Sequence, residues 1–287
     1  MTTYDRTTED TGNVVSLDHV NVQIADQQQA TLFYIVGLGL TRDPYMMVGL
    51  ENMWLNAGRQ QFHAPTRPTA PQVLRGEIDM VVPDLDDLEE RLSIVEPQLE
   101  GTQFAFARSN EHMDVTCPWG NKFVITGPND KFGAKFGVPH VVFNVPAGTA
   151  QRIASFYSTV LGAISSVSER DGSPAAVVQT GTEQTMVFRE DADETRSYDG
   201  HHIAIYITDF SGPHDRLDAR GLVSEESNAH QYRFRDIVDL ETGEVLYTLE
   251  HEVRSLRHPM YARELVNRDP LVNLPNYTRR AEYLRID

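Results

Sequence analysis

The 287-residue chain contains one cysteine, Cys117. A single thiol cannot form an intrachain disulfide, and the absence of disulfides is typical of proteins from a reducing compartment. Long apolar runs are also missing, since none approaches the roughly 20 residues of a membrane-spanning helix. Residues 1–14 are too polar for a signal peptide. The sequence therefore predicts a cytoplasmic protein without a membrane partner.

Positive charge is scarce. The chain has 25 Lys and Arg residues against 42 Asp and Glu residues, which gives a formal net charge of −17 at pH 7. Such an acidic protein repels a phosphate backbone, so the composition argues against nucleic acid as a partner. Apolar residues make up 40% and charged residues 23% of the chain, as in an ordinary globular protein.

Several catalytic motifs are absent as well. No Gly-x-Gly-x-x-Gly loop follows a strand pattern, and neither a P-loop nor a Gly-x-Ser-x-Gly nucleophile elbow occurs. Cys117 stands between a predicted strand and Pro118, which favours packing over use as a nucleophile. The sequence thus gives no support to dinucleotide, nucleotide-phosphate or serine-hydrolase chemistry.

What the sequence does contain is a four-fold internal repeat. Four segments each begin near a His or Glu and then place apolar residues largely at every second position, which is the period of a half-buried β-strand. The aligned residues are separated by 58, 63 and 62 positions and are His19, Glu77, His140 and His202. Strand alternation places the neighbouring His201 on the face opposite to His202.

The residues after these strands repeat too. In the first and third copies a helical pattern ends in an aromatic pair, with a glycine five residues after the tyrosine, at Gly39 and Gly162. Glycine there is typical of the left-handed residue that follows a helix. In the second copy Asp84 is a predicted N-cap for a helix from Leu85 to Val95. Three short strand patterns follow, so each repeat is predicted to be a β-α-β-β-β module.

The predicted fold class is α+β, with four tandem βαβββ modules paired into two curved-sheet, barrel-like domains. We expect a flexible leader at 1–14, an N-terminal domain of two modules at 15–130, and a C-terminal domain of two modules at 138–253. A linker is predicted at 127–137. The arm at 254–287 mixes prolines, arginines and apolar pairs, so we expect it to lie over its own domain or over a neighbouring subunit. The second case would make the protein a homo-oligomer.

With these modules, the sequence resembles the vicinal oxygen chelate superfamily, which includes glyoxalase I, bleomycin-resistance proteins and type I extradiol dioxygenases. Four modules in one chain resemble the extradiol dioxygenases most, and the resemblance covers about residues 15–253. It implies an enzyme that cleaves a catechol-like small aromatic substrate with O₂.

The resemblance also implies a metal site in the C-terminal domain. The first-strand histidines of its two modules, His140 and His202, would face each other across a cavity, and a last-strand glutamate, Glu250, would complete the ligand set. Two histidines and one carboxylate suit Fe(II), with Mn(II), Zn and Ni as the other metals to consider.

One departure from the family pattern concerns the glutamate. In the family it follows a turn glycine by four residues, whereas Glu250 follows Gly243 by seven. A bulge would bring Glu250 inward. Otherwise Tyr247 or His251 faces the site.

Five further residues are candidates for smaller roles. The resemblance implies an acid/base histidine near the site, which His230 matches within a residue, with Tyr232 on the same strand; the alternative for His230 is a solvated turn residue. In the N-terminal domain, His19, His63 and Glu77 are predicted to be relics of a site or pocket residues. The last-strand position of the second module falls near a valine, which cannot bind a metal.

Three functions stay open. The leading hypothesis is an Fe(II)- or Mn(II)-dependent ring-cleaving dioxygenase. A glyoxalase-like isomerase or lyase with Zn or Ni would need a fourth protein ligand. A metal-free protein that binds a small molecule, as the bleomycin-resistance proteins do, would use the cavity alone.

Overall fold

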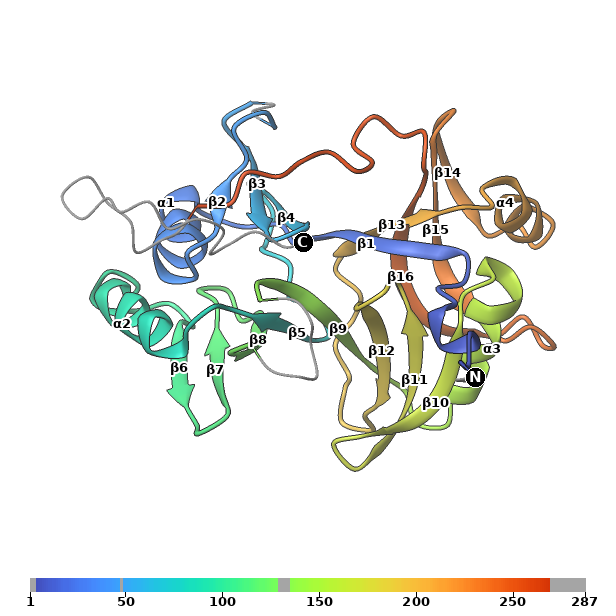
Figure 1. Ribbon diagram of the computed structural model, residues 1–287, viewed down its shortest axis with the longest axis horizontal. Helices are drawn as coiled ribbons and strands as arrows, with labels where there is room; N and C mark the ends of the chain where they lie inside the picture. The colour runs from blue at the N-terminus through green and yellow to red at the C-terminus, as the bar shows by residue number, and fades with distance from the viewer. Residues whose placement is uncertain (1–3, 47–48, 129–134, 269–287) are drawn as a thin grey trace.

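Four β-α-β-β-β units follow one another in the computed structural model, which describes residues 4–46, 49–128 and 135–268 (Figure 1). The predicted α+β fold class and the four-fold repeat are confirmed. The predicted leader, linker and arm extend into residues 1–3, 129–134 and 269–287, which lie outside the described residues.

The first two modules share the same element order. Module one comprises β1 (Val14–Asn21), α1 (Gln27–Ala30) with a π-helical turn (Thr31–Gly37), β2 (Thr41–Arg42), β3 (Asn52–Ala57) and β4 (Gln60–Pro65). Module two comprises β5 (Gly76–Val81), α2 (Leu85–Val95), β6 (Ala105–Arg108), β7 (His112–Thr116) and β8 (Lys122–Thr126).

The last two modules repeat that order. Module three comprises β9 (Gly137–Val145), α3 (Ala150–Phe156) with a π-helical turn (Tyr157–Leu161), β10 (Ser165–Arg170), β11 (Ser173–Gln179) and β12 (Thr185–Glu190). Module four comprises β13 (His202–Ile207), α4 (Ser211–Asp218), β14 (Val223–Asn228), β15 (Gln231–Val238) and β16 (Val245–Ser255).

The helix ends follow from local sequence. The Asp84 carboxylate accepts hydrogen bonds from the backbone N–H groups of Asp86 and Asp87 at 2.7 and 3.2 Å, so α2 begins where its cap was predicted. Gly39 and Gly162 both have positive φ, at 76° and 67°, which confirms the predicted left-handed residues. No helix in the described parts of the chain is both long enough and apolar enough to cross a membrane.

The modules join into two eight-stranded sheets, but not in the expected pairs. One sheet has the order β14-β15-β16-β13-β1-β4-β3-β2, and the other has the order β10-β11-β12-β9-β5-β8-β7-β6. Module one therefore shares a sheet with module four, and module two shares one with module three. The expectation that each predicted domain would form its own sheet, with His140 opposite His202, is wrong.

The reason lies in the first strand of each module. One edge of that strand pairs in parallel with the last strand of its own module, as β13 does with β16, and the other edge is left for another module. All four first strands carry a similar apolar alternation, so the pattern does not choose between partners. The pairing of β5 with β9 is marked in the sequence by a glycine. A Cβ on Gly76 would lie 1.9 Å from the Val142 carbonyl oxygen, so β5 approaches β9 closely only with glycine there.

Side-chain packing nevertheless joins the modules in chain order. Modules one and two meet where Phe33 and Tyr34 contact Phe123. Modules three and four meet where Phe156 contacts Phe234 and Phe188 contacts Tyr247. In Figure 1 the first two modules lie on the left and the last two on the right, with β1 running between them. The domain boundaries at 130 and 138 stay a prediction.

Candidate metal centre

The seam between β1 and β13 brings two histidines together. In this antiparallel pair Asn21 lies opposite His202 and His19 lies opposite Ala204, so His19 and His202 are diagonal neighbours on one face. Their ring centroids are 5.9 Å apart. On the next strand, Glu252 of β16 pairs with Ala204. One ligand atom from each of His19, His202 and Glu252 lies within 4.8 Å of the others.

One ring nitrogen of His19 is hydrogen-bonded, and the other has no hydrogen-bond partner among the described residues. Its Nδ1 lies 2.9 Å from Asp18 Oδ2, and that oxygen also accepts a 2.7 Å hydrogen bond from Arg254 Nη1. An ionised carboxylate can only accept a hydrogen bond, so the proton of the neutral His19 ring lies on Nδ1 and Nε2 carries the lone pair. Nε2 is buried and has no hydrogen-bond partner. The β1–β13 pairing is irregular between Leu17 and His19, and this bulge lets Asp18 reach the ring beside it.

His202 is held in its neutral form. Burial, followed by the nearby His19 and Arg233, lowers the pKa of His202 well below the ordinary value. Its Nε2 lies 3.7 Å from Glu252 Oε2. A neutral imidazole is the form that binds a metal ion, so desolvation prepares this residue as a ligand.

Glu252 is a buried carboxylate with two guanidinium partners. Arg233 Nη2 lies 2.8 Å from its Oε2, and Arg254 Nη2 bonds its Oε1. Burial raises the pKa of Glu252, but His19, Arg254 and Arg233 outweigh it, and the pKa is lowered overall. The group is therefore an anion at neutral pH.

A third histidine, His63 of β4, occupies the place in module one that Glu252 has in module four. β4 pairs in parallel with β1 as β16 does with β13, with His63 opposite Asn21. Its ring stacks on Trp54 at a centroid distance of 4.1 Å and lies 6.0 Å from the ring of His19. Burial, with help from His19, lowers its pKa to about 3. Its Nε2 is buried and unpartnered, as is that of His19.

These donors fit a divalent metal. Two imidazoles and a carboxylate form the set that binds non-haem Fe(II) and also suits Mn, Zn or Ni. The unpartnered Nε2 of His19, backed by Asp18 through Nδ1, is the arrangement of a metal-binding histidine. An unsatisfied polar atom in a buried site is costly unless something binds it. We call His19, His202 and Glu252 the metal triad.

Solved structures share the architecture that holds this triad. Glyoxalase I from Zea mays aligns with a TM-score of 0.59 at 13% identity, over 84% of this chain and 92% of that one. The chain has the vicinal oxygen chelate fold. A single-substitution variant of the maize protein aligns with a TM-score of 0.61 at 12% identity, over 84% and 92% of the two chains. A Bacillus subtilis protein designated a candidate dioxygenase gives 0.57 at 15% identity, over 86% of each chain.

The fold that the resemblance implied is thus confirmed. No family model matches the sequence, and no curated protein matches it either. The fold does not name the reaction.

His140 does not belong to the triad. It lies on β9 in the other sheet, opposite Asp79 of β5 and Thr185 of β12, and its Nδ1 is 2.6 Å from Thr185 Oγ1. The prediction that His140 and His202 share a metal is wrong, because module four pairs with module one. His19, expected to be a relic, takes the place foreseen for His140.

Glu250 was the predicted carboxylate ligand, but the metal triad contains Glu252, two residues further along β16. Glu250 is the register partner of His202 and lies on the same face as Glu252. Glu250 instead pairs with Arg233 Nη1, and its Oε1 is 3.7 Å from His202 Nδ1. The signal in the sequence was the alternation Glu250-His251-Glu252, which offers two carboxylates to one face.

The two alternative inward residues face the protein core. His251 is fully buried, stacks on Phe234 at 4.2 Å, and accepts a 2.6 Å hydrogen bond from Tyr157 at Nε2. Burial lowers its pKa to about 3. Tyr247 contacts Phe188 on the same side of the sheet. Neither side chain faces the triad, which corrects both alternatives.

The two proposed catalytic residues are not joined to the triad. Tyr232 is buried on the core side of β15, against Phe210 and His214. Its predicted catalytic role is therefore wrong. His230 lies in the β14–β15 turn, where its carbonyl accepts from the Ser255 N–H. A catalytic role for His230 stays a prediction.

In the other sheet, two of the four equivalent positions are occupied by valine, which cannot bind a metal. There Glu77 occupies the position equivalent to His19, and His140 the position equivalent to His202. Val124 is equivalent to His63, and Val187 is equivalent to Glu252. Two arginines neutralise the remaining carboxylates. Arg189 Nη1 lies 3.1 Å from Glu77 Oε1, and Arg170 Nη2 lies 2.7 Å from Asp79 Oδ2. Glu77 is thus part of an ion-pair network, and its role as a relic of a site or as a pocket residue stays a prediction.

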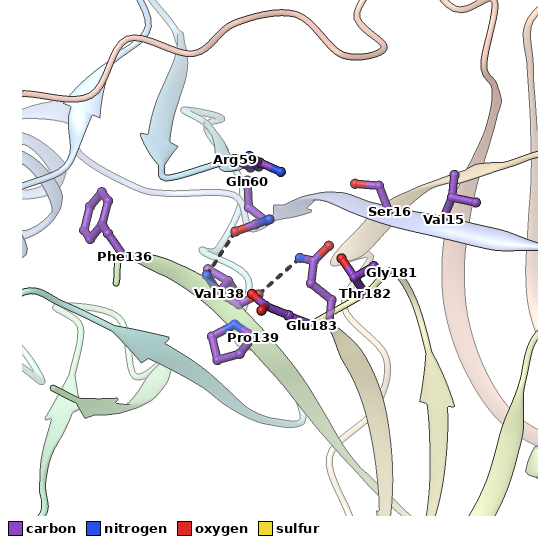
Figure 2. Close-up of a pocket in the computed structure, with 11 residues that line it drawn as sticks. Val15, Ser16, Arg59, Gln60, Phe136, Val138, Pro139, Gly181, Thr182 and Glu183 are labelled. Atoms are coloured by element: carbon purple, nitrogen blue, oxygen red, sulfur yellow. Dashed lines mark hydrogen bonds between the residues drawn. The ribbon is translucent and has the colours of Figure 1, made fainter. Parts of the chain in front are cut away.

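A separate cleft lies where the two sheets approach each other, between the starts of β1 and β9 (Figure 2). Gln60 Oε1 accepts from the Val138 N–H at 3.1 Å. Gln184 Nε2 donates to the Val138 carbonyl at 3.2 Å and its Oε1 accepts from the Leu17 N–H at 3.3 Å. These amides tie the sheets together. The cleft shares no residue with the metal triad, so its polar groups serve the architecture.

Proposed function

We propose that this protein is a metal-dependent dioxygenase that opens the ring of a catechol-like substrate, and that His19, His202 and Glu252 hold its Fe(II) or Mn(II). The observation that carries the proposal is the group of two histidines and one glutamate, two buried and one partly buried, whose ligand atoms lie within 4.8 Å of one another. Such a set leaves coordination positions open on one side, as ring-cleaving oxygenases need.

The chain's own residues have defined tasks in this proposal. Asp18 fixes the His19 tautomer, and the surroundings of His202 keep its ring neutral. The stacked rings of Trp54 and His63 give the site an aromatic side beside His19, which favours a planar aromatic substrate. The bound metal would supply Lewis acidity toward two adjacent substrate oxygens and redox chemistry toward O₂.

The test begins with the metal content of protein purified without oxygen. We expect about one iron or manganese per chain and O₂ uptake on addition of catechols. His202→Ala and Glu252→Gln should lose the metal, because each removes one of three ligands. His140→Ala is the matched control and should keep it, since His140 lies in the other sheet. Full metal occupancy in His202→Ala would refute the site.

A second function has an observation of its own. With His63, the site offers four protein donors related by the repeat, the number that a glyoxalase-like isomerase or lyase with Zn or Ni would use. Stoichiometric zinc or nickel without O₂ uptake would favour that function. If no metal binds at all, the two arginines on Glu252 would mark a metal-free binding protein instead.

A further inference from the structure

The carboxylate of the metal triad already has cations against both of its oxygens. Arg254 Nη2 bonds Glu252 Oε1, and Arg233 Nη2 lies 2.8 Å from Glu252 Oε2. Oε2 is also the oxygen nearest to His202, at 3.7 Å from its Nε2. A guanidinium therefore stands at the oxygen that faces the other ligands.

The two arginines differ in how firmly they are held. Arg254 is almost fully buried, and it also donates to Asp18 at 2.7 Å and to Gln231 at 3.1 Å. Its position is fixed by groups that have no part in binding the metal directly. Arg254 can therefore support Glu252 whether or not a metal is bound.

Arg233 has other partners among the acidic side chains. Its side chain is 20% exposed, its Nη1 bonds Glu250, and its Nε lies 3.7 Å from Glu225. It can release Glu252 and keep an ion pair with Glu250 on the same strand face. That face also carries His202, the register partner of Glu250.

We propose that Arg233 is a built-in counter-ion that competes with the metal for Glu252, and that Glu250 retains it when the metal binds. This inference rests on the metal triad of the proposed function. Two positive charges on one buried carboxylate oxygen repel each other strongly, because the site is poorly solvated. The metal affinity then depends on how strongly Glu250, compared with Glu252, holds the guanidinium of Arg233.

The experiment is a titration of the full-length apoprotein with Co(II), followed by visible absorption and by isothermal calorimetry. Arg233→Gln removes the competitor and should bind Co(II) about tenfold more tightly, a gain of about 1.4 kcal/mol. Glu250→Gln removes the second partner of Arg233, leaves the guanidinium on Glu252, and should bind about tenfold more weakly. Arg235→Gln is the matched control, because Arg235 is an exposed arginine two residues along β15, and should change the affinity less than twofold.

The double variant Arg233→Gln/Glu250→Gln separates competition from a simpler cause. Removal of Arg233 alone could free Glu250 to become an extra ligand. Under the proposal the double variant binds Co(II) more tightly than Glu250→Gln does. Equal affinities of those two variants would overturn it, as would an unchanged or weaker affinity in Arg233→Gln.

The outcomes for the inference and for the proposed function are distinct. Co(II) binding that Glu252→Gln abolishes but Arg233→Gln leaves unchanged would overturn only the role of Arg233. Failure of both the wild-type protein and Arg233→Gln to bind Co(II) or Mn(II) would overturn the metal triad itself. Unfolding curves of each apo variant show whether the fold is kept, and Glu250→Gln tests the same balance if Arg233→Gln does not fold.

Discussion

Asp18 Oδ2 lies 2.9 Å from Nδ1 of His19, the residue that follows it in β1. Adjacent residues of a regular strand point to opposite faces, so this contact exists only because the strand bulges there. The same carboxylate oxygen is held by Arg254, which also holds Glu252. One buried network thus orients two of the three proposed metal ligands.

Asp18→Asn is expected to weaken metal binding by about 10- to 100-fold, because a neutral amide neither fixes the His19 tautomer nor raises the basicity of Nε2 as a carboxylate does. The measurement is the Co(II) dissociation constant of the apoprotein. The unfolding free energy of each apoprotein serves as the control for structural damage. An unchanged dissociation constant in a folded variant would show that Asp18 does not act through His19.

His63→Leu distinguishes between a three-ligand and a four-ligand site. His63 lies outside the group whose ligand atoms are within 4.8 Å, so the dioxygenase proposal expects a loss of metal affinity below about tenfold, or about 1.4 kcal/mol. A four-donor glyoxalase-like site would lose far more. The affinity is measured beside His202→Ala, and a loss in His63→Leu as large as in that variant would favour the second function.

The repeat and its strand starts could be predicted because both depend on local pattern. The column of His19, Glu77, His140 and His202 was read from the period of apolar residues, and the structure places each of them at or near the start of a module. The cap at Asp84 was also predictable, because a carboxylate there satisfies N–H groups only two and three residues away.

Which modules share a sheet could not be predicted, and the error in the site follows from that. β13 could close against β9 or against β1 with equal local propensity, and only the tertiary structure selects β1. Glu252 could not be singled out from the sequence for a related reason. Glu250 and Glu252 both lie on the site face of β16, and the choice between them depends on the register with β13.

Stability is expected to fall as the pH drops below about 6.5, because His63 and His251, like His202, are buried in neutral form. Burial lowers the pKa of His63 and of His251 to about 3 each. In the unfolded chain a histidine has a pKa near 6.5, so between these values the unfolded state binds protons that the folded state does not. Each group then removes up to about 1.4 kcal/mol of stability per pH unit as the pH falls, and none above pH 7.

Chemical denaturation of the apoprotein between pH 7.5 and 5 measures this slope while most carboxylates stay ionised. His251→Gln should flatten the slope by the contribution of one histidine, although the variant is less stable at every pH. His112→Gln, at a partly exposed histidine of β7, is the control for the effect of the substitution itself. Equal slopes for the wild-type protein and His251→Gln would contradict the buried neutral state of His251.

The last prediction concerns the arm that follows β16. Its described part crosses to module one (Figure 1), where Arg263 donates to Asp43 Oδ1 and Oδ2 at 3.3 and 2.7 Å. Asp43 is 1% exposed and also accepts from Gln61 Nε2. Asn267 bonds the backbone of Gly58 in both directions. The arm thus lies against its own chain and links the two modules, one and four, that share this sheet. Assembly into an oligomer stays a prediction.

Arg263→Ala should lower the unfolding free energy by about 2 kcal/mol. Loss of one partner of a fully buried ion pair costs about 3–5 kcal/mol, and the cost is smaller here because Arg263 is partly exposed and Asp43 keeps other donors. Arg268→Ala is the control. Within the described residues its guanidinium donates to the exposed Ile35 carbonyl, so its loss should cost about 0.5 kcal/mol. Equal unfolding free energies for these two variants would show that the arm is not anchored through Asp43.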